Sequence, residues 1–153
     1  MSYTALLEAA TSLCTSFAQK SPPPNLLSHF SPKIKAFEHG PQNFAPFIGR
    51  EFEGIEGVTE YLSLLGKYLD YEAMSFSEYF VDERLGKVSV KGKGRFTWIE
   101  TGVKWDEGFT YTLDYVEEDG ELKVARYQVW ADTGALYLAR LGQRVEDVPA
   151  IAD

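Results

Sequence analysis

The segment Phe37-Glu38-His39-Gly40-Pro41 marks the point at which an extended stretch of this chain ends. The apolar residues Ile34 and Ala36 precede it, and Gly-Pro stops a strand because proline lacks the amide donor that a sheet requires. Histidine gains and loses its proton near neutral pH, and a strand end is a rigid place to hold it against a ligand. His39 is therefore the first candidate for acid–base chemistry.

The hydrophobic pattern around this segment predicts a largely helical first half of the chain. Apolar residues recur every three or four positions in residues 3–20 and 54–69, as in helices with one buried face. A short helix over residues 25–30 and a strand over residues 33–39 are expected between them. Residues 40–53 are expected to form an irregular loop that carries aromatic side chains.

From residue 71 onward the apolar period changes to two, which predicts sequential strands. The strands are expected over residues 71–83, 86–99, 103–117 and 121–131, with a hairpin turn at Glu117–Gly120 and a final helix from Asp132 to about Leu141. This order predicts an α+β fold in which one curved antiparallel sheet carries helices on its concave face, as a cone with an internal pocket. Residues 1–142 then form a single domain, and residues 143–153 form a C-terminal tail.

The charge and composition of the chain make some kinds of binding partner more favourable than others. The chain has 153 residues and a formal net charge of −8, so its surface repels the phosphates of nucleic acids and anionic membranes. An aromatic content of 14% is typical of a fold that lines a cavity. Two histidines and one cysteine without ligand spacing predict no metal, and no glycine-rich phosphate loop points to a cofactor. We expect a cytoplasmic protein that binds neither membrane nor nucleic acid.

Two sets of short motifs resemble the SnoaL-like branch of the nuclear-transport-factor-2-like (NTF2-like) superfamily. The first set is similar to the first strand, loop and following helix of that superfamily, and comprises Phe37–Pro41, Phe47–Arg50 and Gly57–Tyr61. The second is similar to the closing pattern of SnoaL-like cyclases, and comprises Val129–Asp132 and Leu138–Gly142. The resemblance spans residues 3–142 and implies the NTF2-like cone as the fold.

The resemblance implies a cofactor-free isomerase, cyclase or dehydratase that transfers protons on a hydrophobic, carbonyl-bearing substrate. The alternative is a non-catalytic ligand-binding or dimerisation module of the same fold. His39 takes the place of the carboxylate that moves the proton in the isomerases, and Asp132 matches the acid/base of the cyclases. The resemblance also implies a homodimer formed through the outer face of the sheet.

Each candidate residue also has a structural interpretation. His39 is a general base or a histidine that holds the turn; Asp132 is an acid/base or the N-cap of the final helix. Tyr111 and Tyr115 are oxyanion donors or core residues. The other expected pocket residues are Phe17, Phe47, Tyr61, Phe96, Trp98, Arg126 and Trp130. The sequence predicts that His39, Asp132, Trp130 and at least one of the two tyrosines surround a pocket of ~300 Å³ or more.

Overall fold

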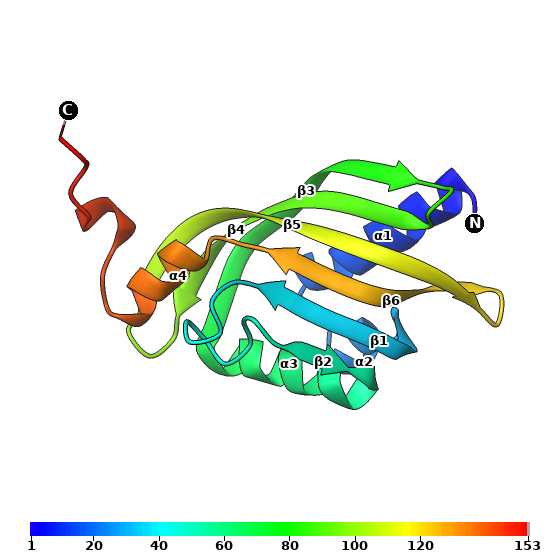
Figure 1. Ribbon diagram of the computed structural model, residues 1–153, viewed down its shortest axis with the longest axis horizontal. Coiled ribbons are helices and arrows are strands. Elements are labelled where there is room, and N and C mark those ends of the chain that lie inside the picture. Colours follow the sequence, from blue (N-terminus) through cyan, green and yellow to red (C-terminus); the bar gives the residue numbers. More distant parts are fainter. Residues whose placement is uncertain (153) are drawn as a thin grey trace.

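The two hydrophobic periods of the sequence become two layers in the computed structural model, which describes residues 1–152 (Figure 1). Before a short 3₁₀ helix, η1 (Val145–Asp147), four α-helices and six strands follow one another along the described residues. They are α1 (Tyr3–Ala18), α2 (Pro23–Leu27), β1 (Phe30–His39), β2 (Glu51–Glu53), α3 (Gly54–Tyr68), β3 (Leu69–Asp82), β4 (Lys87–Trp98), β5 (Val103–Glu118), β6 (Glu121–Trp130) and α4 (Thr133–Arg140). The α+β architecture that the sequence predicts is confirmed.

The strands form one curved sheet in the order β2-β1-β6-β5-β4-β3. Neighbouring strands run antiparallel except β1 and β6, which run parallel, so the expectation of a wholly antiparallel sheet is wrong at this pair. Parallel neighbours need a long connection, and here everything from β2 to β5 lies between them. The hydrophobic period does not record strand direction, and for that reason the sequence did not reveal it.

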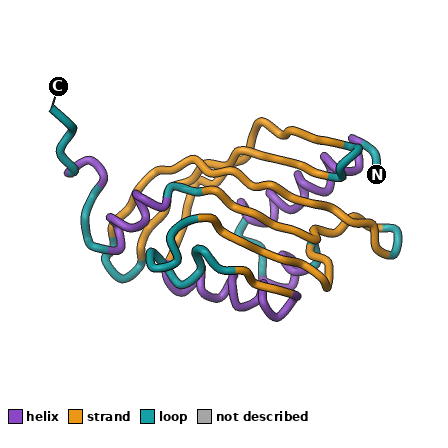
Figure 2. The backbone as a smooth tube through the Cα atoms, in the orientation of Figure 1, coloured by secondary structure: helices purple, strands orange, loops and turns teal. Residues whose placement is uncertain are grey.

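Helices α1, α2 and α3 lie on the same side of the sheet, where they cover its concave face (Figures 1 and 2). The apolar stripe of α1 buries Leu6 and Leu13, and that of α3 buries Val58 and Tyr61. These side chains meet the inward-facing residues of the strands, such as Leu113, to form the core. Burial of one helical stripe against the sheet is the main source of stability for both helices.

The pairing of β3 with β4 is irregular, whereas the pairing of β4 with β5 is regular at the two glycines of β4. The β3–β4 register shifts twice, next to Ala73 and Glu78, which both have positive φ. The β4–β5 register is continuous through Gly92. A Cβ atom at Gly92 would run into the ring of Phe109, so this glycine makes room for an aromatic side chain on the concave face.

The chain after β6 turns into α4 at Asp132, whose Oδ1 accepts a hydrogen bond of 3.0 Å from the amide of Ala135. Residues 141–152 are exposed and extend away from the sheet (Figure 1). Among the helices of residues 1–152, none is both long enough and apolar enough to cross a membrane.

Candidate functional site

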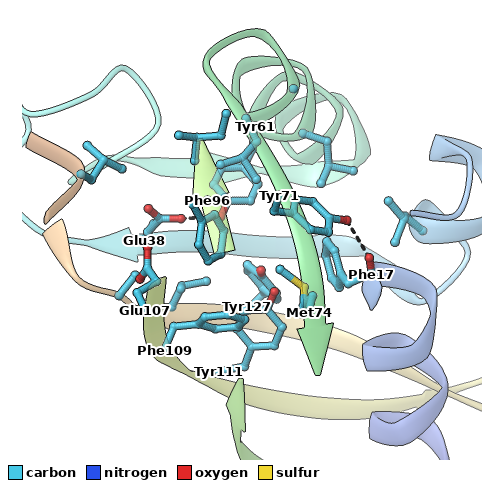
Figure 3. A pocket seen from close by; sticks show the side chains of 18 of the residues that line it. Phe17, Glu38, Tyr61, Tyr71, Met74, Phe96, Glu107, Phe109, Tyr111 and Tyr127 are labelled. Atoms are coloured by element: carbon cyan, nitrogen blue, oxygen red, sulfur yellow. Dashed lines mark hydrogen bonds between the residues drawn. The ribbon is translucent and has the colours of Figure 1, made fainter. Parts of the chain in front are cut away.

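A cavity of about 220 Å³ lies between the concave face of the sheet and the helices α1 and α3 (Figure 3). It is smaller than the ~300 Å³ expected from the sequence. Most of its wall is apolar or aromatic. The residues with aromatic rings are Phe17, Tyr61, Tyr71, Phe96, Phe109, Tyr111 and Tyr127. Three acidic residues, Glu38, Glu107 and Asp132, also line it.

Glu38 points into this cavity because it shares the inward face of β1 with Ile34 and Ala36. Its side chain is buried, and its Oε1 accepts a hydrogen bond of 2.8 Å from the hydroxyl of Tyr61 in α3. Burial raises the pKa of Glu38 from 4.5 to about 8; the Tyr61 hydrogen bond opposes this rise, and the charge of Glu107 adds to it. At neutral pH this carboxyl group is mostly protonated.

Glu107 reaches the cavity from β5, where it alternates into the same face as Trp105 and Phe109. Its Oε1 accepts a hydrogen bond from the indole nitrogen of Trp105, and its Oε2 accepts one from the amide of Asp132, each 2.9 Å long. Burial raises the pKa of Glu107 from 4.5 to about 7, although both hydrogen bonds lower it. This carboxyl group therefore changes its protonation state close to neutral pH.

The two carboxyl groups lie near each other at one end of the cavity, with Phe96 and Phe109 beside them (Figure 3). The strand register explains the meeting. Glu38 is opposite Val129 near the end of β6, and β5 continues past that end to place Glu107 next to Asp132. Two raised carboxyl pKa values in one apolar cavity give the site an acid and a base at the same pH.

Three buried tyrosines form the floor of the cavity. Tyr127 of β6 lies 5.0 Å from Tyr111 and 6.0 Å from Tyr61, measured between ring centroids. Burial raises the pKa of all three phenols well above 10. Because they stay neutral at physiological pH, their hydroxyl groups remain hydrogen-bond donors.

The structure brings some of the residues expected from the sequence into this cavity. Phe17, Tyr61, Phe96, Tyr111 and Asp132 line it. Asp132 is exposed at its edge, and its Oδ1 caps α4, so the N-cap interpretation describes the contact it makes.

His39 is not part of this cavity, and the expectation that it shares a pocket with Tyr111 is wrong. It follows Glu38 in the strand, so its side chain points to the opposite, outer face. There its ring stacks on Trp130 with centroids 4.1 Å apart, and its Nε2 lies 2.9 Å from Oε1 of Gln128. The strand period that brings Glu38 inward turns His39 outward.

The other expected pocket residues also lie outside the cavity lining. Arg126 and Trp130 are exposed on the outer face of β6. Phe47, Trp98 and Tyr115 are buried in the core without lining the cavity. The sequence interpretation instead missed Glu38, Glu107 and Tyr127.

Within the described part of the chain, no three His, Cys, Asp or Glu side chains are arranged to hold a metal ion.

Comparison with known structures agrees with this geometry. An NTF2-like protein of unknown function from Burkholderia pseudomallei has a TM-score of 0.70 at 16% identity, over 88% of this chain and 94% of the other. This chain has the NTF2-like fold. TerC, crystallised with polyporic acid, matches with a TM-score of 0.70 at 20% identity, over 87% of this chain and 95% of its own.

A ketosteroid isomerase-like protein from Erwinia carotovora atroseptica matches with a TM-score of 0.65 at 18% identity, over 84% of this chain and 94% of its own. No protein-family model matches the sequence. No curated protein matches it either. The similarity to NTF2-like proteins is therefore seen in the three-dimensional structure and not in a match to a family model or to a curated sequence.

Proposed function

We propose that this protein is a cofactor-free enzyme that binds a hydrophobic, carbonyl-bearing small molecule and moves a proton on it. Isomerisation, cyclisation and dehydration are the reactions that such chemistry serves. The observation that carries the proposal is the pair Glu38 and Glu107, two carboxyl groups with raised pKa values in an otherwise apolar cavity. Such pairs are characteristic of acid–base sites. A ketosteroid isomerase-like neighbour supports this class of reaction.

The two carboxyl groups differ in role because Glu107 has two donors that stabilise its ionised form, whereas Glu38 has one. Glu107, with a pKa of about 7, is the group more readily ionised at neutral pH and serves as the base. Glu38, with a pKa of about 8, is mostly protonated and serves as the acid, with Tyr61 holding its Oε1. In the floor of the cavity, the hydroxyl groups of Tyr111 and Tyr127 interact with each other and with that of Tyr61. A substrate oxygen that gains negative charge would draw a hydrogen bond from this chain of neutral hydroxyl groups.

The proposal is tested by hydrogen exchange at the carbon next to a carbonyl group. β-Tetralone, a neutral bicyclic ketone, is incubated with the protein in deuterium oxide, and loss of its α-proton signal is followed by NMR. We expect the protein to accelerate the exchange, and Glu107→Gln to lower the acceleration by at least ~100-fold, the low end for a general base. Glu60→Gln, which removes an exposed carboxylate paired with Arg50, is the matched control and leaves the rate unchanged.

A non-catalytic ligand-binding module is the second candidate, and one observation favours it. Both oxygens of Glu107 and one oxygen of Glu38 already accept hydrogen bonds from the protein, as structural carboxyl groups do. β-Tetralone that binds in the cavity without accelerated exchange would establish this function and refute the enzyme.

We further propose a homodimer that forms through the outer face of the sheet. The charged side chains of that face pair within the chain, as Lys91 does with Glu78 at 3.2 Å. Two large apolar side chains remain exposed there, Phe80 by 74% and Trp130 by 45%. Exposed aromatic rings beside neutralised charges favour contact with a second copy.

A further inference from the structure

The lining of the cavity contains acidic side chains but no basic ones. Glu38, Glu107 and Asp132 line it, and no Lys, Arg or His is among the described residues of its wall. A ligand that carries a carboxylate or phosphate would find no cation to pair with and would face like charge in a poorly solvated space. This lining disfavours anionic ligands.

Aromatic rings surround the two carboxyl groups in the cavity wall. Phe96 and Phe109 lie next to the two glutamates, with their ring centroids 6.0 Å apart in an edge-to-face arrangement, and Tyr111 packs 5.2 Å from Phe109 (Figure 3). The face of an aromatic ring attracts a cation, and this attraction is stronger in a desolvated site than in water. The rings and the carboxyl groups therefore both favour a positive charge at this end of the cavity.

Glu38 retains an acceptor that the protein does not use. Glu38 is buried, with a relative exposure of 6%. Its Oε1 accepts a hydrogen bond from the hydroxyl group of Tyr61. Its Oε2 has no hydrogen-bond donor among the described residues. The carboxyl group faces the cavity (Figure 3). When Glu38 is protonated, its Oε2 oxygen carries the proton and can donate it; when Glu38 is ionised, the oxygen needs a donor or a positive charge from outside the described residues.

We propose that the ligand of this cavity carries a positively charged, substituted ammonium group, which lies between the carboxyl groups of Glu38 and Glu107 and against the rings of Phe96 and Phe109. The inference rests on the proposed function in one respect, because the same cavity holds the ligand; it does not depend on proton transfer. It narrows the substrate class from hydrophobic carbonyl compounds to those that also carry a cationic nitrogen.

The groups that surround the carboxyl pair do not compete with such a cation. Tyr61 faces it from α3, Tyr127 from β6 and Tyr111 from β5, and all three are neutral phenols; Asp132 faces it from the N-terminus of α4. From β3, Tyr71 reaches the cavity with its hydroxyl bonded to the carbonyl of Phe17 in α1.

One cation of the chain, Lys20, lies beside the cavity-lining residue Tyr71 and is paired outside the cavity. Lys20 lies 4.8 Å from the centroid of the Tyr71 ring and pairs with Asp70 at 2.9 Å. Its charge is thus held at the outer side of the cavity wall, away from Glu38 and Glu107.

A cation that binds to a protonated carboxyl pair displaces a proton, so its affinity depends on pH. Glu107 has a pKa of about 7, and its ionised fraction rises about tenfold between pH 6 and pH 8. The affinity for a cationic ligand should rise by about the same factor over this range, because the cation prefers the ionised form. A neutral ligand of the same shape gains nothing from ionisation, so its affinity should not rise.

Three ligands of the same branched shape test the proposal by calorimetry. Choline carries a quaternary ammonium group, neohexyl alcohol replaces its nitrogen by carbon, and the tert-butylacetate anion carries a negative charge. At pH 8 we expect choline to bind at least ~10-fold more tightly than the alcohol, and the anion to bind least. Glu107→Gln and Glu38→Gln should each remove most of the preference for choline, whereas the surface control Glu60→Gln should retain it.

The outcomes separate this proposal from the proposed function. Equal affinities for choline and neohexyl alcohol, or an affinity for choline that is flat between pH 6 and pH 8, would overturn the cationic ligand and leave proton transfer standing. Preferential choline binding, together with β-tetralone that binds but is not exchanged, would support the cationic ligand and count against the enzyme. No binding of any of the three ligands would overturn the proposal together with the cavity as their binding site.

Discussion

Replacement of Glu38 by glutamine should change how the stability of this protein depends on pH. Glutamine has nearly the same shape as protonated glutamate, and its side-chain oxygen can still accept the hydrogen bond from Tyr61 that Glu38 accepts at 2.8 Å. The folded protein raises the pKa of Glu38, mainly through burial. In the pH range between the unfolded and folded pKa values, the folded state binds more protons than the unfolded state. Stability must therefore fall as pH rises through that range.

The size of the effect follows from the two pKa values. The rise from 4.5 to about 8 places the loss between about pH 4.5 and pH 8, above which it is complete. At ~1.4 kcal/mol per pKa unit, ionisation of Glu38 removes about 4 kcal/mol of stability between pH 5 and pH 9. Since Glu107 shares part of the electrostatic response, we expect wild type to lose about 2–4 kcal/mol more than Glu38→Gln over this range.

Urea denaturation at pH 5, 7 and 9, followed by tryptophan fluorescence, measures this difference. The two proteins should have similar unfolding free energies at pH 5, and the variant should be the more stable at pH 9. Glu60→Gln, which changes an exposed carboxylate, should follow the wild-type curve. Parallel pH dependences for wild type and Glu38→Gln would show that Glu38 ionises freely in the folded protein and would refute the reasoning on which the acid–base site is built.

Three further changes test other parts of the structure. Gly92→Ala should cost about 1–3 kcal/mol in urea denaturation and weaken β-tetralone binding, because the new methyl group pushes the ring of Phe109 toward the cavity; unchanged binding would contradict this role of Gly92. Tyr115→Phe should leave stability unchanged or raise it by up to about 1 kcal/mol, since no described residue bonds its buried hydroxyl group, and a larger loss would reveal a missing partner. Trp130→Glu should turn a dimer into a monomer in sedimentation, and a wild type that is monomeric at micromolar concentration would refute the proposed interface.

The sequence allowed the fold to be predicted because its two hydrophobic periods are long and regular. The turn between β5 and β6 follows from its residues as well, since Asp119 and Gly120 have the positive φ that a two-residue hairpin requires. The parallel pairing of β1 with β6 could not be predicted in this way. Alternation fixes the face on which a side chain lies but carries no information on which strand becomes its neighbour.

The candidate site was predictable in part, and the information that was missed lies in the same alternation. Ile34 and Ala36 mark the inward face of β1, and counting by two from them reaches Glu38, not His39. Phe109 and Tyr111 mark the inward face of β5, and the same count leads back to Glu107. Residue type pointed to histidine, whereas position in the strand pointed to the carboxyl groups.

The alternation of side chains along a strand does not explain why a carboxyl group lies on an apolar face. Such a residue at a strand end is equally compatible with a solvated rim. The β1–β6 pairing and the continuation of β5 past β6 bring Glu38 and Glu107 together under α3. Their pKa values are consequences of that meeting, and the sequence alone does not contain them.

The stability cost of these two carboxyl groups is itself an argument for a ligand. Apolar side chains of similar size at positions 38 and 107 would fill the same space without any loss of stability as pH rises. The protein instead supports each group with donors, Tyr61 for Glu38, and Trp105 with the amide of Asp132 for Glu107. Burial raises the pKa of both groups, and these donors lower it again. The two opposing effects leave both pKa values near neutral pH. A purely structural cavity does not need carboxyl groups with pKa values near neutral pH, whereas a site that transfers protons or binds a cation does.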